Sequence, residues 1–289
     1  MTVLLALSAG DDPAAVLFVD GVLRAAVREC VLTRVPASGF PSAAVDAVLD
    51  IAGLRASEVS GGVVTGLADR GLAGRARDLF RTAKAVAGAG ARVRAGVAPR
   101  EALGRAELPA ALARSRLPSA GWREVAPEAA RVALASRAAW ALPHAAGLAL
   151  GAAWVHTPTL RLPDGPALWG PTFGDLDAYR ALSNADLPRA RTEAPVAFAR
   201  SVLADGGSVV WSAGPAGFLE VPLGPRLLLR PGNGVVPPGW CGPDVLDLAV
   251  AVGLCGPDGF PTVTPSDTVR AWRHHGATAL VLGDYTVRR

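Results

Sequence analysis

The opening of the chain contains three short apolar runs, and they restrict its fold more than any other feature of the sequence. Each run has the length and composition of a β-strand: Val3–Leu7, Ala15–Val19 and Val22–Val27. The dipeptide Asp20-Gly21 separates the last two runs and is a strong signal for a two-residue hairpin turn. The opening therefore predicts three consecutive antiparallel strands.

The residues after these strands predict a helix and a returning strand. Pro41–Ile51 has the spacing of an amphipathic helix and is followed by Gly53, a residue that commonly ends helices. Gly62–Thr65 is then a short apolar run typical of a buried strand. This order of elements indicates an α/β fold. From Leu67 to Leu142 the chain is rich in alanine, arginine and proline, which predicts several short helices joined by loops.

The end of the chain carries a clear helix start. In Thr264-Pro265-Ser266-Asp267, threonine is suited to the N-cap, proline to the first helical position and the acid to a capping box. Thr278–Leu282 then predicts a buried strand. The pair His274-His275 falls at the end of the same helix, where cationic side chains interact favourably with the helix terminus.

Composition narrows the class of protein. The 289 residues are 51% apolar and 19% charged, so the chain is long enough for two folded domains and is not disordered. Its formal charge of +4 is spread along the sequence, which argues against a nucleic-acid partner. The longest apolar stretch, Trp140–Val155, is shorter than the about 18 residues that span a bilayer, so no membrane segment is expected.

Cysteine and histidine usage points to no metal site. The three cysteines lack CxxC spacing, and their odd number does not suggest a disulfide framework, so a reducing cytoplasm fits best. The four histidines do not have the ligand spacing of a recognised metal type. A different reaction at the C-terminus, built from Cys241, Cys255, His274 and His275, would need a spacing that the sequence does not single out.

The closing stretch resembles the C-terminal signature of the nodulation and antibiotic O-carbamoyltransferases. That signature has the form TP-x-D followed by a buried LVLG strand, and the residues in register are Thr264, Pro265, Asp267, Leu280, Val281, Leu282 and Gly283. The beginning of the chain is similar to the opening of the same family, with matches at Glu29, Thr33, Arg34, Phe40 and Pro41. The stretch Pro143–Trp154 is similar to a glycine- and alanine-rich family helix.

The resemblance implies two domains of α/β class. Residues 1–157 would form a shortened actin-like domain, residues 158–171 a linker, and residues 172–289 a C-terminal carbamoyltransferase domain related to the threonylcarbamoyl-adenylate synthase (YrdC-like) fold. The helix expected at Pro195–Asp205 and the sequence GGSVVW after it fit the entry to that second domain.

Most ligand residues of the family pattern are replaced in this chain. The family's metal-binding HHxxHA motif is missing, its aspartate ligand corresponds to Ala145, and Arg226 is the one arginine left of its phosphate-binding pattern. The first turn of the family carries a histidine, which is Asp11 or Asp12 here; this turn is either simply solvated or a retained ligand contact. The candidate ligand-binding residues implied by the resemblance are Asp11, Asp12, Glu29, Arg34 and Arg226.

Two functions follow from the resemblance. The first is a divergent, catalytically impaired family member that acts as a partner or regulatory subunit, bound to a second copy or to a full-length carbamoyltransferase homologue. The alternative is an active O-carbamoyltransferase that uses ATP, magnesium and carbamoyl phosphate to form carbamoyl adenylate and carbamoylate a hydroxyl of a sugar or natural product. The loss of charged residues favours the first, because each missing preorganised donor costs about 3 kcal/mol of transition-state stabilisation.

Overall fold

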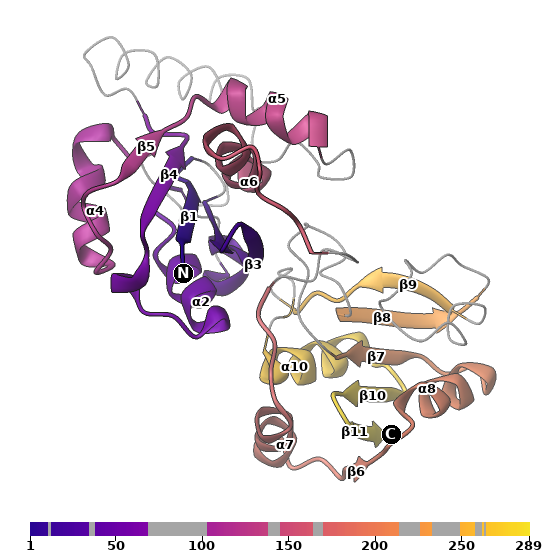
Figure 1. Ribbon diagram of the computed structural model, residues 1–289. Helices are drawn as coiled ribbons and strands as arrows, with labels where there is room; N and C mark the ends of the chain where they lie inside the picture. Colours follow the sequence, from indigo (N-terminus) through magenta and orange to yellow (C-terminus); the bar gives the residue numbers. More distant parts are fainter. Residues whose placement is uncertain are drawn as a thin grey trace, which may run out of the picture. The chain divides into compact units, whose positions relative to one another are not determined.

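The chain forms two compact units, each built around its own mixed sheet. The computed structural model describes residues 1–10, 13–34, 38–68, 103–137, 145–163, 170–213, 226–232, 249–257, 262 and 264–289. The first unit is Met1–Leu162 and the second is Pro163–Arg289. In each unit, helices pack on a sheet that contains both parallel and antiparallel strand pairs. The protein is therefore of mixed α/β class (Figure 1). The identities of the two domains remain predictions.

The first sheet has the order β3-β2-β1-β4-β5. β1 pairs antiparallel with β2 and parallel with β4, so it lies at the centre of the sheet. The three antiparallel strands and the returning strand expected from the sequence are confirmed. The strands are β1 (Val3–Ser8), β2 (Ala14–Val19), β3 (Val22–Arg28), β4 (Gly61–Thr65) and β5 (Trp122–Glu124).

The predicted hairpin between β2 and β3 is also confirmed. Val19 pairs with Val22 across the turn. Asp20 and Gly21 both have positive φ, at 49° and 79°. Two consecutive residues with positive φ are what a type I′ turn requires, and this turn matches the right-handed twist of the strands on either side.

Helices cover both faces of the first sheet. They are α1 (Glu29–Thr33), α2 (Ser42–Ala52), α4 (Leu108–Arg114), α5 (Pro127–Arg137) and α6 (Ala145–His156), with short 3₁₀ turns at Ala56–Glu58 and Arg105–Glu107. The apolar side of α2 packs with Leu5, Leu7 and neighbouring residues on one face. α6 packs against β1, β2 and β4 outside that cluster, and therefore covers the opposite face, with α5 packed on α6 (Figure 1). The predicted helix ending at Gly53 is confirmed as α2, where Gly53 has a φ of 66°.

One strand of this sheet was not expected. Between Leu67 and Leu142 only short helices and loops were predicted, but Trp122–Glu124 forms β5 in parallel with β4. Its three residues are too few and too polar to give a strand pattern. A tertiary contact holds it, because the Trp122 ring fills the space beside Gly62, where a Cβ would lie 2.5 Å from the ring.

The second sheet has the order β6-β11-β10-β7-β8-β9. β7 and β10 form its central parallel pair. α7 and α10 pack on one face, and α8 packs on the other. The helices predicted at Pro195 and Pro265 and the strand predicted near Thr278 are confirmed. The elements are α7 (Asp175–Asn184), β6 (Ala190–Arg191), α8 (Pro195–Ala204), β7 (Val209–Ser212), β8 (Arg226–Pro231), β9 (Ala249–Gly253), α10 (Pro265–His275), β10 (Ala279–Leu282) and β11 (Tyr285–Arg288).

The packing of α5 on α6 depends on Gly151, and this gives a testable prediction. A Cβ at Gly151 would lie 2.0 Å from the backbone carbonyl oxygen of Ala130. Gly151→Ala should therefore destabilise the protein by about 2 kcal/mol, because overpacking against rigid backbone outweighs the gain of about 1 kcal/mol in helix propensity. Urea denaturation measures the change. Val155→Ala, on the exposed side of the same helix, is the control and should stay within about 0.5 kcal/mol of wild type; a stabilised Gly151→Ala variant would contradict this packing.

Candidate functional site

The five candidate ligand-binding residues lie in different surroundings. Asp11 and Asp12 fall outside the residues that the structure describes. Glu29 is the first residue of α1 and Arg34 is its C-cap, both in the first unit, whereas Arg226 begins β8 in the second unit.

Glu29 caps a helix with its carboxylate. The residue follows β3 directly, and its side chain is 8% exposed. Oε1 accepts a hydrogen bond from the Ala43 amide at 3.2 Å, and Oε2 accepts one from the Ala44 amide at 2.8 Å. Both amides belong to the first turn of α2, whose own N-cap residue, Pro41, makes no side-chain cap. A carboxylate at this position satisfies orphan donors and complements the helix dipole.

Arg34 ends α1 through its backbone. It adopts the left-handed conformation, with a φ of 56°, and its amide donates to the carbonyl oxygen of Cys30 at 2.9 Å. Glycine usually occupies such a position because other residues pay a steric cost there. The arginine at this position therefore has a backbone role in closing the short helix.

Arg226 is a fully buried arginine. Its exposed fraction is 0%, and one guanidinium nitrogen, Nη1, donates to the carbonyl oxygen of Ala213 at 2.9 Å. The guanidinium carbon lies 4.9 Å from the centre of the Phe173 ring, within the range of a cation–π contact. Burial lowers the pKa of Arg226 to about 10, so the side chain remains charged at neutral pH. A ligand could reach this charge only by displacing the atoms that cover it.

Hydroxyl groups lie near Arg226 at the end of the central parallel pair. Ser212 is the last residue of β7 and pairs with Arg226 across the sheet. The Thr268 hydroxyl lies 3.2 Å from the Ser212 hydroxyl and 3.2 Å from the backbone oxygen of Thr264. Thr262, just before α10, is also buried, and its hydroxyl has no hydrogen-bond partner. This end of the sheet is the most polar part of the described core in the second unit.

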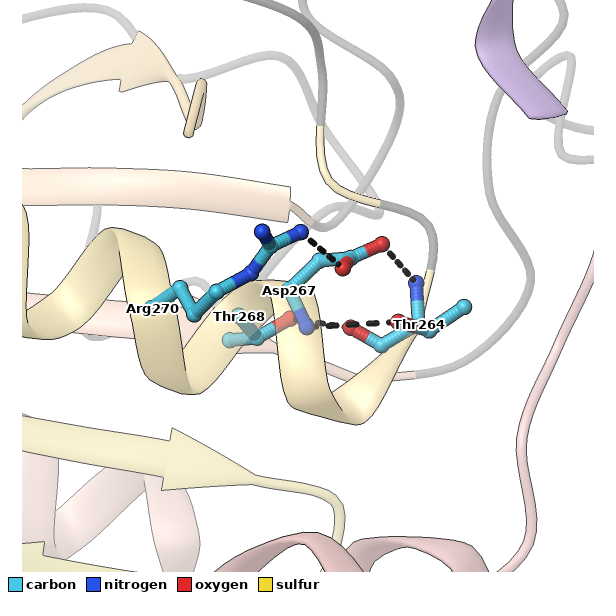
Figure 2. Close-up of polar contacts among 4 residues, drawn as sticks. All are labelled: Thr264, Asp267, Thr268 and Arg270. Carbon is cyan, nitrogen blue, oxygen red and sulfur yellow. Dashed lines mark hydrogen bonds and ion pairs between the residues drawn. The ribbon is translucent and has the colours of Figure 1, made fainter. Parts of the chain in front are cut away.

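The family-like residues at the start of α10 form the predicted capping box (Figure 2). The Asp267 amide donates to the Thr264 hydroxyl at 3.2 Å, and the Thr264 amide donates to Asp267 Oδ2 at 3.3 Å. Arg270 also donates to Asp267 Oδ1 at 2.8 Å. The carboxylate of Asp267 thus bonds to groups of its own helix. This match to the family signature therefore has a structural role, as a helix cap.

The histidine pair lies in the last turn of α10, as expected from the sequence. The two rings are arranged edge to face, with their centres 5.0 Å apart. His275 Nε2 lies 2.9 Å from the carbonyl oxygen of Cys255. Within the described ranges, no group of three or more His, Cys, Asp or Glu side chains is placed to hold a metal ion. Cys241 and His144 are not among the described residues.

Two hydroxyls in the first unit escaped the sequence predictions. Ser8 directly follows the first predicted strand, and Thr65 is the last residue of the predicted returning strand. Both are 0% exposed, and neither hydroxyl has a hydrogen-bond partner. They pair directly across β1 and β4. The only available signal was that both apolar runs end in a hydroxyl-bearing residue, and only the strand register brings these two residues together.

Comparison of the chain with protein-family models found no matching family, and comparison with curated proteins found no match. The relationship to the carbamoyltransferases therefore rests on the sequence pattern and remains a proposal. Among the helices in the described parts of the chain, none is long and apolar enough to cross a bilayer.

The helix-capping contact of Glu29 predicts a stability effect. Glu29→Ala should lower the free energy of unfolding by about 1–3 kcal/mol, because two amides in the first turn of α2 lose a charged acceptor. Thermal or urea unfolding, followed by circular dichroism, measures this loss. Glu58→Ala is the control, since the Glu58 carboxylate caps an exposed turn. An unchanged stability for Glu29→Ala would show that Glu29 does not hold α2.

Proposed function

We propose that this protein is a divergent relative of the O-carbamoyltransferases that has lost most of its catalytic capacity and acts as a partner or regulatory subunit. The observation that carries the proposal is the use of the charged residues that match the family pattern. Glu29 and Asp267 cap helices, and Arg226 is buried against a backbone carbonyl and an aromatic ring. Residues that a transferase would aim at its substrates are engaged here by the protein itself.

The arrangement of the first unit supports the proposed ancestry. An actin-like domain begins with three antiparallel strands, a helix and a returning strand. In this chain β1, β2 and β3 are antiparallel neighbours, α2 follows, and β4 returns beside β1 in parallel. The second unit contributes the helix and strand that the closing signature predicts, at α10 and β10. The proposal therefore assigns an actin-like origin to the first unit and a YrdC-like origin to the second.

The electrostatics of the second unit support impaired catalysis. Binding a phosphate dianion and stabilising its transfer need several guanidinium or backbone donors directed at the same oxygens. Arg226 is the arginine that the chain retains from the family's phosphate pattern, and its burial keeps it from solvent. Each lost donor costs about 3 kcal/mol, or about a hundredfold in rate, so several losses leave little catalysis by this route.

The proposed partner is a second copy of the chain or a full-length carbamoyltransferase homologue. A family member that has lost its ligand residues but kept its packing residues can still present the surfaces of the fold. We propose that this chain uses its fold to associate with the partner. The active homologue, and not this chain, would then bind the carbamoyl donor and the acceptor hydroxyl.

Thermal unfolding with and without ligands tests the proposal. A ligand present at 100 times its dissociation constant adds about 2.7 kcal/mol to the free energy of unfolding. We expect millimolar ATP, magnesium and carbamoyl phosphate, alone and together, to leave the melting temperature of the wild-type protein unchanged. Arg226→Lys and wild type should respond alike.

The matched control is Arg230→Lys, on the same strand but with an exposed side chain. A rise in melting temperature that Arg226→Lys abolishes and Arg230→Lys retains would overturn the proposal. That result would favour the alternative, an active transferase that forms carbamoyl adenylate with ATP, magnesium and carbamoyl phosphate.

A further inference from the structure

The strand β9 forms one edge of the second sheet (Figure 1). It has five residues, Ala249–Gly253, and pairs on one side with β8. The sequence from 248 to 257 contains no charged residue. Sheet edges are templates for pairing with another chain, and proteins usually protect them with charged side chains, short strands or a covering segment. A neutral edge strand of this length therefore indicates a partner strand.

The other three edges of the two described sheets are protected in these ways. β3 carries the exposed Arg24, and its first residue bridges to Arg161 in the segment after α6. β5 has only three residues, and two of them are charged. β6 has only two residues, and one of them is Arg191. The contrast singles out β9 as the edge suited to pairing.

The backbone of β9 presents hydrogen-bonding groups on its outer side. The Leu254 amide donates to the Arg226 carbonyl oxygen at 2.9 Å, which continues the pairing with β8. Backbone groups of an antiparallel strand point alternately to either side, so those of Val250 and Val252 are directed at β8. The outward-directed residues are Ala249, Ala251 and Gly253. Within the described ranges, no other backbone group hydrogen-bonds to these three residues.

The exposed side chains of β9 are two valines on the same face of the sheet. Val250 is 43% exposed and Val252 is 45% exposed. Val252 lies opposite Leu228 of β8, and side chains at opposed positions point to the same face. Leu228 is buried in the cluster formed with α7 and α10, and neither valine belongs to that cluster. The apolar surface of this face therefore continues past the described cluster to the edge of the sheet.

From this edge we infer that the second unit pairs with a second copy of the chain through β9, in antiparallel orientation about a two-fold axis at Ala251. The outward-directed groups of the two strands then form about six hydrogen bonds. Val250 of each copy lies opposite Val252 of the other, so the exposed valines of both copies meet on one face. Each copy contributes the same surface, as a two-fold interface requires.

Charge favours a second copy as the occupant of this edge. In a symmetric antiparallel pair, each charged residue of the strand lies near its own counterpart or another residue of the same strand. Like charges directly opposite each other destabilise strand pairing, and β9 brings none. Five paired residues bury less than the about 1,000 Å² of a stable interface, so we expect a weak and reversible dimer.

This pairing deepens the proposed function and rests on it for its biological role, because it names the partner as a second copy and the contact surface as β9. The backbone and side-chain complementarity of β9 does not depend on a carbamoyltransferase ancestry.

Sedimentation equilibrium of the full chain, from about 5 to about 500 µM, tests the pairing. We expect wild type to shift from monomer toward dimer as its concentration rises. Val250→Lys combined with Val252→Lys should weaken the dimer about tenfold or more, because lysine then lies opposite lysine at two places. Val250→Lys combined with Val252→Glu should dimerise more strongly than the double-lysine variant, because lysine then lies opposite glutamate.

Val155→Lys is the matched control, because Val155 is a valine of the first unit with a similar exposed fraction, 41%. This variant should dimerise like wild type. A wild-type protein that remains monomeric at the highest concentration would overturn the pairing. Equal dimerisation of wild type and the double-lysine variant, or of the double-lysine and lysine–glutamate variants, would overturn it as well.

Amide hydrogen exchange of the wild-type protein supplies a readout that needs no substitution. The amides of Ala249, Ala251 and Gly253 should exchange more slowly at about 500 µM than at about 5 µM, because the second copy protects them. Exchange that does not change with concentration would contradict the pairing.

The pairing and the proposed function fail in different ways. A rise in melting temperature with ATP, magnesium and carbamoyl phosphate would contradict the proposed function. A monomeric wild type without such a rise would contradict the β9 pairing alone, and would leave the full-length homologue as the proposed partner.

Discussion

The parallel pairing of β1 with β4 is the interaction on which the first unit depends. β1 is the only described strand in this sheet that joins an antiparallel neighbour to a parallel one, and Leu5 and Leu7 at its centre are completely buried. A parallel pair cannot be joined by a tight turn, so the chain must cross over the sheet between β3 and β4. α2 makes that crossing, and the carboxylate of Glu29 fixes where it begins. The burial of this acid follows from the topology.

The second unit also has a central parallel pair of strands that a crossover connection must join. Its central parallel pair is β7 with β10, and the crossing is completed by α10, whose first turn is fixed by Thr264 and Asp267. In both units the central pair includes a buried hydroxyl at its carboxyl end. At β7 the Ser212 hydroxyl has Thr268 as its neighbour, whereas the hydroxyls of Ser8 and Thr65 have no such partner.

Much of the fold could be predicted from the sequence because its signals are local. The Asp20-Gly21 turn, the end of α2 at Gly53 and the capping box of α10 all depend on residues within a few positions of one another. β5 could not be predicted, because Trp122 is held in the sheet by its contact with the distant Gly62.

The candidate site was harder to predict, because its contacts also join residues that are distant in the sequence. Glu29 and Arg226 were singled out as candidate ligand-binding residues, and only the tertiary structure reveals that one caps a helix and the other is a buried cation. The pairing of Ser8 with Thr65 depends on a register between strands that are more than fifty positions apart.

The central claim is that the charged residues retained from the transferase pattern now serve the fold. The most direct test is pyrophosphate release from ATP in the presence of magnesium and carbamoyl phosphate, because formation of carbamoyl adenylate must release pyrophosphate. The account predicts no release above the rate without protein. Release by the wild-type protein that is lost in Arg226→Lys and retained in Arg230→Lys would contradict it.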